Sequence, residues 1–429
     1  MQRYQIKQYE LNNAYEEILM KRTCKVLALL LCLLFWAVPS TMGDETLKIF
    51  GNANMDQTID EKDIAYVEDI ISGKSQTTEF ADANNDGKVD AQDIDQIQVL
   101  IDDNAKSITI KDSANRVVTV KLPINRFISA DYRTTEPLIA IGAAEKICAV
   151  DTTFHERMSE FGLADRPEVA VHAGEVNYEL ILKMQSDLVV VAASKASTAN
   201  DTSKKLKGCP VIAISPTTRK SIIPDLRLLG YVLGERKGAE KLISWIKEHE
   251  DIVEDRVKDI PSSDYPKFYY ESSSDQKLWY AYTPVGGSIL DGCAADNIAS
   301  SLGSSSSYQI EPEWLLTQNP DFMFLDMMQG AESGPGKTEE DMAALWMKLK
   351  DQRQFPGFLD IKAIKINNFY IIDRDITSGP RWVVGHAYFA KCMHPELFTD
   401  IHPDEWNLEY LKEFFGLDIT GTWAYPMPK

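Results

Sequence analysis

The sequence predicts an α/β protein with two similar lobes joined by a single long helix, preceded by a small helical module. Three observations predict this fold. Short apolar strands alternate with helices after Ser107, one helix–turn–strand unit occurs twice, and a long amphipathic stretch separates its two copies. The chain has 429 residues, enough for two or three domains, and 44% of them are hydrophobic, which is ample for packed cores.

Charge and cysteine content exclude several classes of function. The net charge of −20 argues against nucleic acid as a partner, because phosphate binding needs a clustered basic surface. There is no C-x-x-C pair, nucleophile elbow, P-loop or H-E-x-x-H motif, so we predict neither a zinc site nor an enzyme. The cysteines beyond residue 43 are interpreted as buried thiols, with a disulfide among them left open: Cys148, Cys209, Cys293 and Cys392.

The first 43 residues have the layout of a secretory signal. Lys21, Arg22 and Lys25 precede the apolar run Val26–Val38, and small residues follow up to Gly43. The run has 13 residues, whereas a membrane-spanning helix needs about 20. We therefore expect export to the cell surface or a periplasm-like space, with Met20 as a second candidate start. The alternative is an uncleaved leader that tethers the protein to a membrane.

Two acidic segments, Asn52–Asp63 and Asp82–Asp93, repeat at a spacing of 30 residues. Oxygen-bearing side chains stand at positions 1, 3, 5, 9 and 12 of each, and position 7 offers a backbone carbonyl, as in loops that wrap around calcium. The predicted ligands of two calcium ions are Asn52, Asn54, Asp56, Thr58, Asp60 and Asp63, then Asp82, Asn84, Asp86, Lys88, Asp90 and Asp93. The alternative is a pair of acidic turns without metal.

A helical pattern follows each loop, and Asp stands at position 12 in both. This arrangement resembles a type I dockerin module over residues 46–103. The resemblance implies calcium-dependent folding and attachment to a cohesin-bearing protein. Position 6 departs from the pattern in the first loop, where Gln57 replaces the glycine found at Gly87 in the second, and we expect a weaker first site. The residues implied in cohesin docking are Glu61, Lys62, Ala91 and Gln92.

The larger domain opens with a predicted β-hairpin over Ile108–Val120. Further on, Glu179–Asp187 predicts a short helix with a turn, and a buried strand follows at Leu188–Val191. The same unit recurs at Glu313–Leu325. Between the two copies, an apolar stripe at helical spacing predicts one long helix from about 223 to 257.

Over residues 107–418 this order resembles a class III substrate-binding protein of an ABC importer, with further matching motifs at Pro224–Gly230, Gly379–Arg381 and His394–Phe398. The resemblance implies lobe 1 at about 107–222, a linking helix at about 223–258 and lobe 2 at about 259–418, and the tail 419–429 has no assignment. It also implies capture of a ferric siderophore, haem or cobalamin for delivery to a permease. The alternatives are a molybdate or tungstate binder of the same fold, a dockerin-borne glycan-active enzyme, or a surface adhesion protein.

The resemblance also implies that Glu179 and Glu313 bind arginines of the permease. The alternative role for these two acids is stabilisation of helix N-termini. A ligand is expected between the lobes, at loops that follow strands. Arginine and aromatic side chains suit a bulky anionic chelate. The candidate ligand-binding residues are arginines and aromatic residues together with one lysine and one serine: Tyr132, Arg133, Lys195, Ser197, Trp279, Tyr280, Tyr282, Arg381 and Trp382.

Overall fold

The computed structural model describes residues 46–171, 175–193, 196–215, 219–272, 279–284, 288–327 and 333–428. All of these described residues belong to one compact unit. The predicted leader, residues 1–43, lies outside the described residues. Within the described ranges, none of the helices combines the length and apolar character that crossing a membrane requires.

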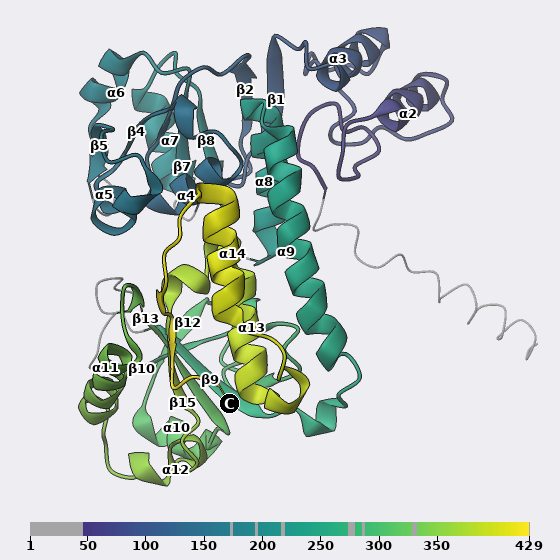
Figure 1. The fold of residues 1–429 in the computed structure, drawn as a ribbon. Coiled ribbons are helices and arrows are strands. Elements are labelled where there is room, and N and C mark those ends of the chain that lie inside the picture. The colour runs from purple at the N-terminus through teal and green to yellow at the C-terminus, as the bar shows by residue number, and fades with distance from the viewer. Residues whose placement is uncertain are drawn as a thin grey trace, which may run out of the picture. The chain divides into compact units, whose positions relative to one another are not determined.

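Loop and helix alternate twice at the start of the described chain, as predicted (Figure 1). Helix α2 (Glu61–Ile71) begins after Asp60, and helix α3 (Ala91–Ile101) begins after Asp90. Each of these aspartates accepts backbone N–H bonds of the first turn, and each helix has a reciprocal capping box with the aspartate three residues on. The local sequence therefore fixes where both helices start.

Lobe 1 follows an antiparallel hairpin of β1 (Ser107–Lys111) and β2 (Val117–Lys121). Its sheet has the order β6-β5-β4-β3-β7-β8, parallel except for β6 at the edge. The strands are β3 (Phe127–Ser129), β4 (Ile147–Asp151), β5 (Glu168–Val171), β6 (Glu175–Val176), β7 (Leu188–Ala192) and β8 (Val211–Ile214). The helices are α4 (Tyr132–Ala140), α5 (Thr152–Met158), α6 (Tyr178–Met184) and α7 (Ala196–Lys205).

Lobe 2 is a mixed sheet in the order β12-β10-β9-β13-β15-β17, with parallel central strands. The strands are β9 (Lys267–Ser272), β10 (Trp279–Tyr282), β11 (Asp296–Asn297, beside β9), β12 (Ser307–Ile310), β13 (Phe322–Met327), β15 (Phe369–Asp373) and β17 (Ala424–Tyr425). The helices are α10 (Pro312–Gln318), α11 (Glu339–Gln352), α12 (Lys362–Lys365), α13 (Trp382–Met393) and α14 (Pro403–Phe415).

The expected boundary of lobe 2 at residue 418 is corrected by the last strands. Strand β17 pairs with β15, and β16 (Gly421–Thr422) pairs with β14 (Gly334–Pro335). The tail without an assignment therefore belongs to lobe 2, where β17 joins the main sheet and β16 forms a separate two-stranded sheet with β14.

Two helices, not one, occupy the predicted linking region. Helix α8 (Arg219–Leu233) ends before Gly234, whose φ of +71° is a conformation that glycine adopts readily. Helix α9 (Arg236–Val257) then packs back against α8, and Arg227 of α8 pairs with Glu240 of α9 at 2.9 Å. The prediction of one continuous helix is wrong because the apolar pattern continues on both sides of the break. Of the two, only α9 leads the chain from lobe 1 to the first strand of lobe 2.

The repeated helix–turn–strand unit is confirmed in both lobes, as α6 with β7 and as α10 with β13. The aspartate that ends each turn has the same structural role. Asp187 accepts the backbone N–H of Arg126 (3.0 Å), and Asp321 accepts that of Lys267 (2.8 Å). Each carboxylate thus fixes the start of the neighbouring central strand, which explains why the pattern occurs twice.

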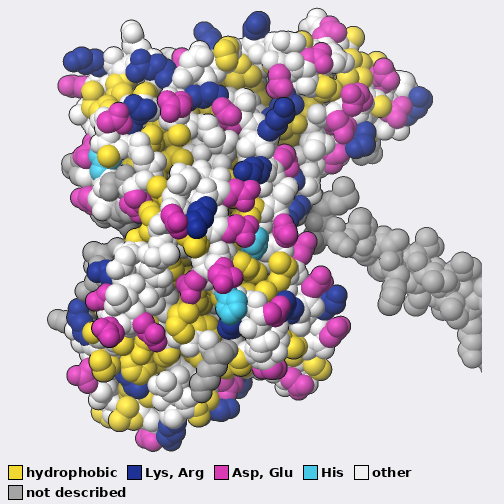
Figure 2. Space-filling model, in the orientation of Figure 1, with side chains coloured by type: hydrophobic (Ala, Val, Ile, Leu, Met, Phe, Trp, Pro, Cys, Tyr) yellow, Lys and Arg dark blue, Asp and Glu magenta, His cyan; other side chains and the backbone are white. Residues whose placement is uncertain are grey.

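Helices α9, α13 and α14 lie side by side and bridge the two sheets (Figure 1). Trp245 of α9 donates to Glu409 of α14 (2.8 Å) and packs against Tyr410 at 5.2 Å between ring centroids. On the face that carries these helices, acidic side chains are dispersed among basic ones (Figure 2). The bridge is therefore a packed helical layer with a charged outer surface.

Candidate ligand site between the lobes

A buried ion pair joins the two lobes. Glu136 of α4 in lobe 1 accepts from Arg381 in a 3₁₀ turn (Gly379–Arg381) of lobe 2, at 2.8 Å from Nε to Oε1 and 3.3 Å from Nη2 to Oε2. The hydroxyl of Tyr410 donates to the same carboxylate at 3.1 Å. Burial raises the pKa of Glu136, and the charge of Arg381 opposes that rise. Arg381 is only 2% exposed, so in this arrangement it offers no surface to a ligand, contrary to our expectation.

Arg133 lies at the start of α4, one helical turn before Glu136. Its guanidinium donates to both carboxylate oxygens of Asp131, at 2.8 and 2.6 Å, and its side chain is 35% exposed. The hydrogen bonds that Arg133 donates to Asp131 raise the pKa of Arg133, while the positive charge of Arg374 acts in the opposite direction. Arg374 belongs to lobe 2, so its charge acts on Arg133 from the other lobe.

Arg374 is that second cation, and it follows the last residue of β15. Its Nη1 donates to Asp326 (2.9 Å) and to the hydroxyl of Tyr282 (3.0 Å), and its side chain is 29% exposed. Asp326 is buried, and its charge raises the pKa of Arg374. Each lobe therefore has one partly exposed guanidinium group that pairs with an aspartate, Arg133 in lobe 1 and Arg374 in lobe 2.

Acidic groups also end central strands in both lobes. Burial raises the pKa of Asp151, at the end of β4, to about 7, and the charge of Asp131 adds to the rise. Burial also raises the pKa of Asp373, at the end of β15, to about 7. Because the carboxyl ends of parallel strands lie at one edge of each sheet, charged residues from distant sequence positions gather between the lobes.

The other predicted ligand residues divide into two groups. Tyr132 and Tyr282 are half-buried beside the arginine pair, and Tyr280 lies on the same face of β10 as Tyr282. Trp279 points the other way into the lobe 2 core and is 7% exposed, while Trp382 is buried under Arg219, whose guanidinium carbon lies 5.3 Å from the ring centroid.

Lys195 lies outside the described residues. Ser197 falls in the first turn of α7, where only the backbone is described.

Sequence reasoning missed Arg374 and its partner Asp326. The signal for Arg374 was present, because it comes directly after a buried strand, where ligand residues of α/β proteins are expected. We assigned the ligand contact to Arg381 seven residues further on instead. Asp326 is part of strand β13 and reads as an interior strand residue, so nothing in the sequence indicated its partner.

The two acids expected to contact a permease occupy matching places in the two lobes. Glu179 is the second residue of α6 and Glu313 the second residue of α10, and both are exposed. Among the described residues, neither carboxylate forms an ion pair. Both side chains are therefore available to a partner, and their role stays a prediction.

The two acidic loops have nearly the same internal hydrogen bonds. The backbone N–H of Asn54 donates to Asp63, and that of Asn84 donates to Asp93, both at 3.1 Å. Across the described ranges, no group of three or more His, Cys, Asp or Glu side chains lies close enough to hold a metal ion. The loop carboxylates accept backbone N–H groups instead, so these contacts do not establish a calcium site.

One buried atom tests whether the first loop fits a hard cation. Oδ1 of Asn52, at loop position 1, is buried without a hydrogen-bond partner, while the amide nitrogen donates to the carbonyls of Leu47 and Asp56 at 2.7 Å. An unsatisfied buried acceptor is costly, and a cation would satisfy it. Burial also raises the pKa of Asp63 to about 6, with the charge of Asp56 adding to the rise. These residues fit a hard cation.

The four cysteines beyond the leader are all free thiols. Cys293 and Cys392 are buried as expected, whereas Cys148 and Cys209 are half-buried. The structure therefore contains no disulfide among these four cysteines.

Two α/β lobes, one crossing helix and charged side chains gathered at the facing strand ends define a two-lobed ligand-binding protein. The sequence model of a family described as periplasmic binding protein matches residues 128–376. The chain belongs to this family.

Comparisons with individual proteins agree with this assignment. An uncharacterized ABC transporter substrate-binding lipoprotein, YvrC of Bacillus subtilis, is 23% identical over 299 residues, which cover 68% of this chain and 87% of the relative. Among solved structures, the TroA-like periplasmic binding protein FepB from Veillonella parvula has a TM-score of 0.64 at 22% identity and covers 74% of this chain and 99% of its own.

Two further structures have the same fold. The molybdate-bound MolA of Haemophilus influenzae has a TM-score of 0.58 at 17% identity, and covers 73% of this chain and 99% of its own. CeuE of Helicobacter pylori, in a Ni–His complex, has a TM-score of 0.57 at 19% identity, and covers 72% of this chain and 96% of its own. These likenesses establish the fold.

Proposed function

We propose that the protein is an exported, non-enzymatic solute-binding protein that captures an anionic metal complex and delivers it to an ABC permease. The observation that carries this proposal is a partly exposed arginine in each lobe, Arg133 and Arg374, each of which follows a central strand within a few residues. A partly exposed guanidinium binds carboxylate, catecholate or oxyanion oxygens well. Tyr132, Tyr280 and Tyr282 supply aromatic surface for the organic body of a chelate.

The names of the related proteins support a metal-containing cargo without identifying it. YvrC is named as an ABC transporter substrate-binding lipoprotein, the MolA structure holds molybdate, and CeuE was solved with Ni–His. A ferric siderophore with acidic donor groups fits the arginine pair best. A molybdate or tungstate ion is the second candidate, because two guanidinium groups also suit a small oxyanion.

Delivery requires a docking surface, and we assign it to Glu179 and Glu313. One exposed carboxylate on each lobe gives two-point contact, which would fix the orientation of the protein on the permease. Both acids stand at the start of a repeated structural unit, so the two halves would offer equivalent contacts.

For the N-terminal module we propose two calcium ions and a cohesin partner. The orphaned oxygen of Asn52 and the matching geometry of the two loops support calcium. Oxygen ligands in a flexible loop are what calcium prefers, and binding would relieve repulsion among the carboxylates. All four side chains expected to contact a cohesin are exposed, namely Glu61, Lys62, Ala91 and Gln92.

Thermal unfolding of the full chain against a ligand panel tests the cargo. The panel holds a ferric catecholate siderophore, haem, cobalamin, molybdate and tungstate. A ligand at one hundred times its dissociation constant stabilises by about 2.7 kcal/mol, which is a shift of several degrees. We expect an anionic member to produce this shift.

The variant Arg374→Gln should remove most of the shift. Its matched control is Arg256→Gln, because Arg256 is also paired with an aspartate and 27% exposed but lies on α9. A shift that only uncharged cobalamin produces, no shift with any member, or hydrolysis of a glycan would each overturn the proposal.

A further inference from the structure

The N-terminal module is joined to the binding domain by direct contacts, and only residues 102–106 separate α3 from β1. The chain before the first loop extends the hairpin: the N–H of Phe50 donates to Thr109, and the N–H of Lys111 donates to Lys48, both at 2.9 Å. Leu47 and Ile49 belong to the same apolar core as Ile110 of the hairpin. The module is thus packed on the domain and does not hang from a linker.

The first acidic loop makes its own contacts with helix α8. Gln57 accepts a hydrogen bond from Arg227 Nη1 at 2.6 Å, and the N–H of Ile59 donates to the hydroxyl of Tyr231 at 3.0 Å. Gln57 and Ile59 stand at loop positions 6 and 8. They alternate with positions 5, 7 and 9, which would supply oxygens to calcium. The segment that would surround the ion is therefore the segment that contacts α8.

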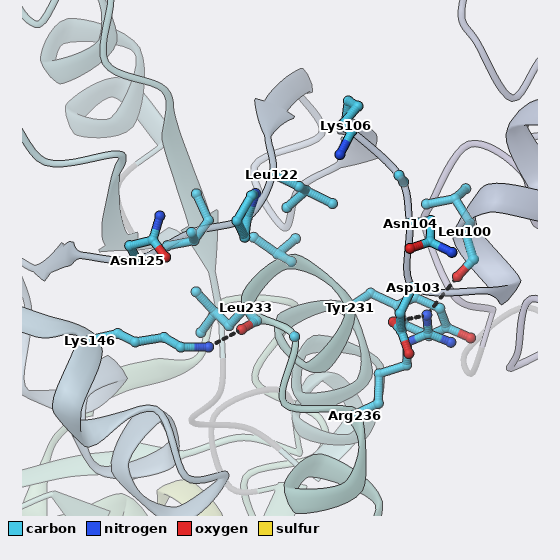
Figure 3. Close-up of a pocket in the computed structure, with 15 residues that line it drawn as sticks. Leu100, Asp103, Asn104, Lys106, Leu122, Asn125, Lys146, Tyr231, Leu233 and Arg236 are labelled. Atoms are coloured by element: carbon cyan, nitrogen blue, oxygen red, sulfur yellow. Dashed lines mark hydrogen bonds and ion pairs between the residues drawn. The ribbon is translucent and has the colours of Figure 1, made fainter.

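A second contact lies at the end of α3 (Figure 3). Arg236, the first residue of α9, donates to the carbonyl of Leu100 at 2.6 Å and pairs with Asp103, and its guanidinium lies 4.3 Å from the ring centroid of Tyr231. These residues form one wall of a cavity of about 570 Å³, whose other walls include Leu122 and Leu233. The module thus holds the α8–α9 turn at two points.

We propose that calcium in the first loop clamps the module onto α8 and α9 and so stabilises the ligand-binding domain. This inference rests on the proposed calcium binding. Without the cation, repulsion among clustered carboxylates loosens the loop and with it the positions of Gln57 and Ile59. With the cation, both residues are fixed against the helix that leads into the linking helix. A glycine at position 6 could not bond Arg227, which gives the departure at Gln57 a structural role.

Tryptophan fluorescence separates the domain from the module in the experiment. The chain has eight tryptophans: Trp36 lies in the predicted leader, and the other seven lie beyond residue 107, with none in the module. In a full-length Trp36→Phe protein, the tryptophan signal therefore reports unfolding of the binding domain alone. We expect saturating calcium to raise this unfolding temperature by about 5 °C relative to protein in EGTA.

Two variants test the contact itself. Tyr231→Phe keeps the ring but removes the hydroxyl that accepts from Ile59, and Gln57→Gly removes the partner of Arg227. We expect the double variant to bind two calcium ions by calorimetry yet to lose at least half of the calcium-dependent temperature rise. The matched control is Tyr66→Phe, whose hydroxyl lies 3.5 Å from the Gln76 carbonyl within the module, and it should keep the full rise.

The outcomes distinguish the two proposals. If two ions bind but the tryptophan transition does not move, the clamp is overturned and calcium binding stands. If calorimetry detects no calcium binding, both fail. A full temperature rise in the double variant, or in a variant whose first loop lacks the Asp56 carboxylate, would also overturn the clamp.

Discussion

Arg381 is held by a buried carboxylate, and that partner determines what its loss would do. Removing one member of a buried ion pair leaves an uncompensated charge, which typically costs about 3–5 kcal/mol. We expect Arg381→Met to lower the free energy of unfolding by an amount of this order, measured by urea denaturation without ligand. Adding Glu136→Gln should restore part of the loss. An Arg381→Met protein as stable as the wild type would instead return this residue to the ligand site.

Asp151 makes stability depend on pH in a direction that its burial determines. Burial raises its pKa to about 7, whereas an unfolded aspartate titrates near 3.9. Between these values the folded protein holds a proton that the unfolded chain has released. The contribution that the raised pKa of Asp151 makes to folding stability is therefore fully present below about pH 4 and is lost as the pH rises through 7.

Asp151→Asn tests this pH dependence, because asparagine retains an oxygen that can accept the Phe154 N–H now bonded to the carboxylate at 3.1 Å. We expect the variant to gain unfolding temperature over the wild type at pH 8 and to gain less at pH 5. An equal difference at both values would mean that the carboxyl keeps its ordinary pKa.

At the scale of elements, the C-terminal tail completes lobe 2. Trp423 lies between the short strands β16 and β17 and is 2% exposed. Its backbone carbonyl accepts the backbone N–H of Asp373 at 2.8 Å. Its ring centroid lies 5.5 Å from the Arg381 guanidinium carbon. The tail therefore covers the strand end that carries Arg374 as well as the interlobe ion pair.

Removal of the Trp423 indole should destabilise the fold strongly. We expect Trp423→Ala to lower the free energy of unfolding by about 3–5 kcal/mol, as is typical for a buried tryptophan. Chemical denaturation measures the loss. The control is Tyr425→Ala at the half-buried neighbour on β17, which should cost less. Equal, small losses at both positions would mean that the tail only rests on the lobe surface.

At the scale of the whole molecule, capture and delivery use different surfaces. Arg133 and Arg374 follow central strands of the two lobes, whereas Glu179 and Glu313 are exposed on separate helices. We expect Glu179→Lys with Glu313→Lys to abolish uptake by cells that carry the cognate permease, while ligand affinity stays within twofold. The control is Glu145→Lys, an exposed acid of lobe 1 outside both surfaces. Normal uptake by the double variant would assign these acids to helix stabilisation alone.

Features set by short-range spacing were predictable from the sequence. The acidic loops, their helices, the hairpin and the repeated helix–Asp–strand unit all depend on residues within about a dozen positions of one another. The exceptions at this range were the break at Gly234 and the strands of the tail. An apolar pattern that continues on both sides of a turn does not reveal the turn, and a strand of two residues is too short to show an alternating hydrophobic pattern.

The site itself was decided by tertiary structure. The sequence determined by itself that this is a two-lobed α/β chain with paired acidic loops, because hydrophobic period and turn chemistry are local properties. It could not tell which arginine faces a ligand. Arg381 meets its carboxylate across 245 positions, whereas Arg133 and Arg374 pair with aspartates and keep part of their side chains exposed. Whether a guanidinium is consumed by a buried partner or left half-exposed depends on what the fold brings beside it, and only the packed lobes decide that.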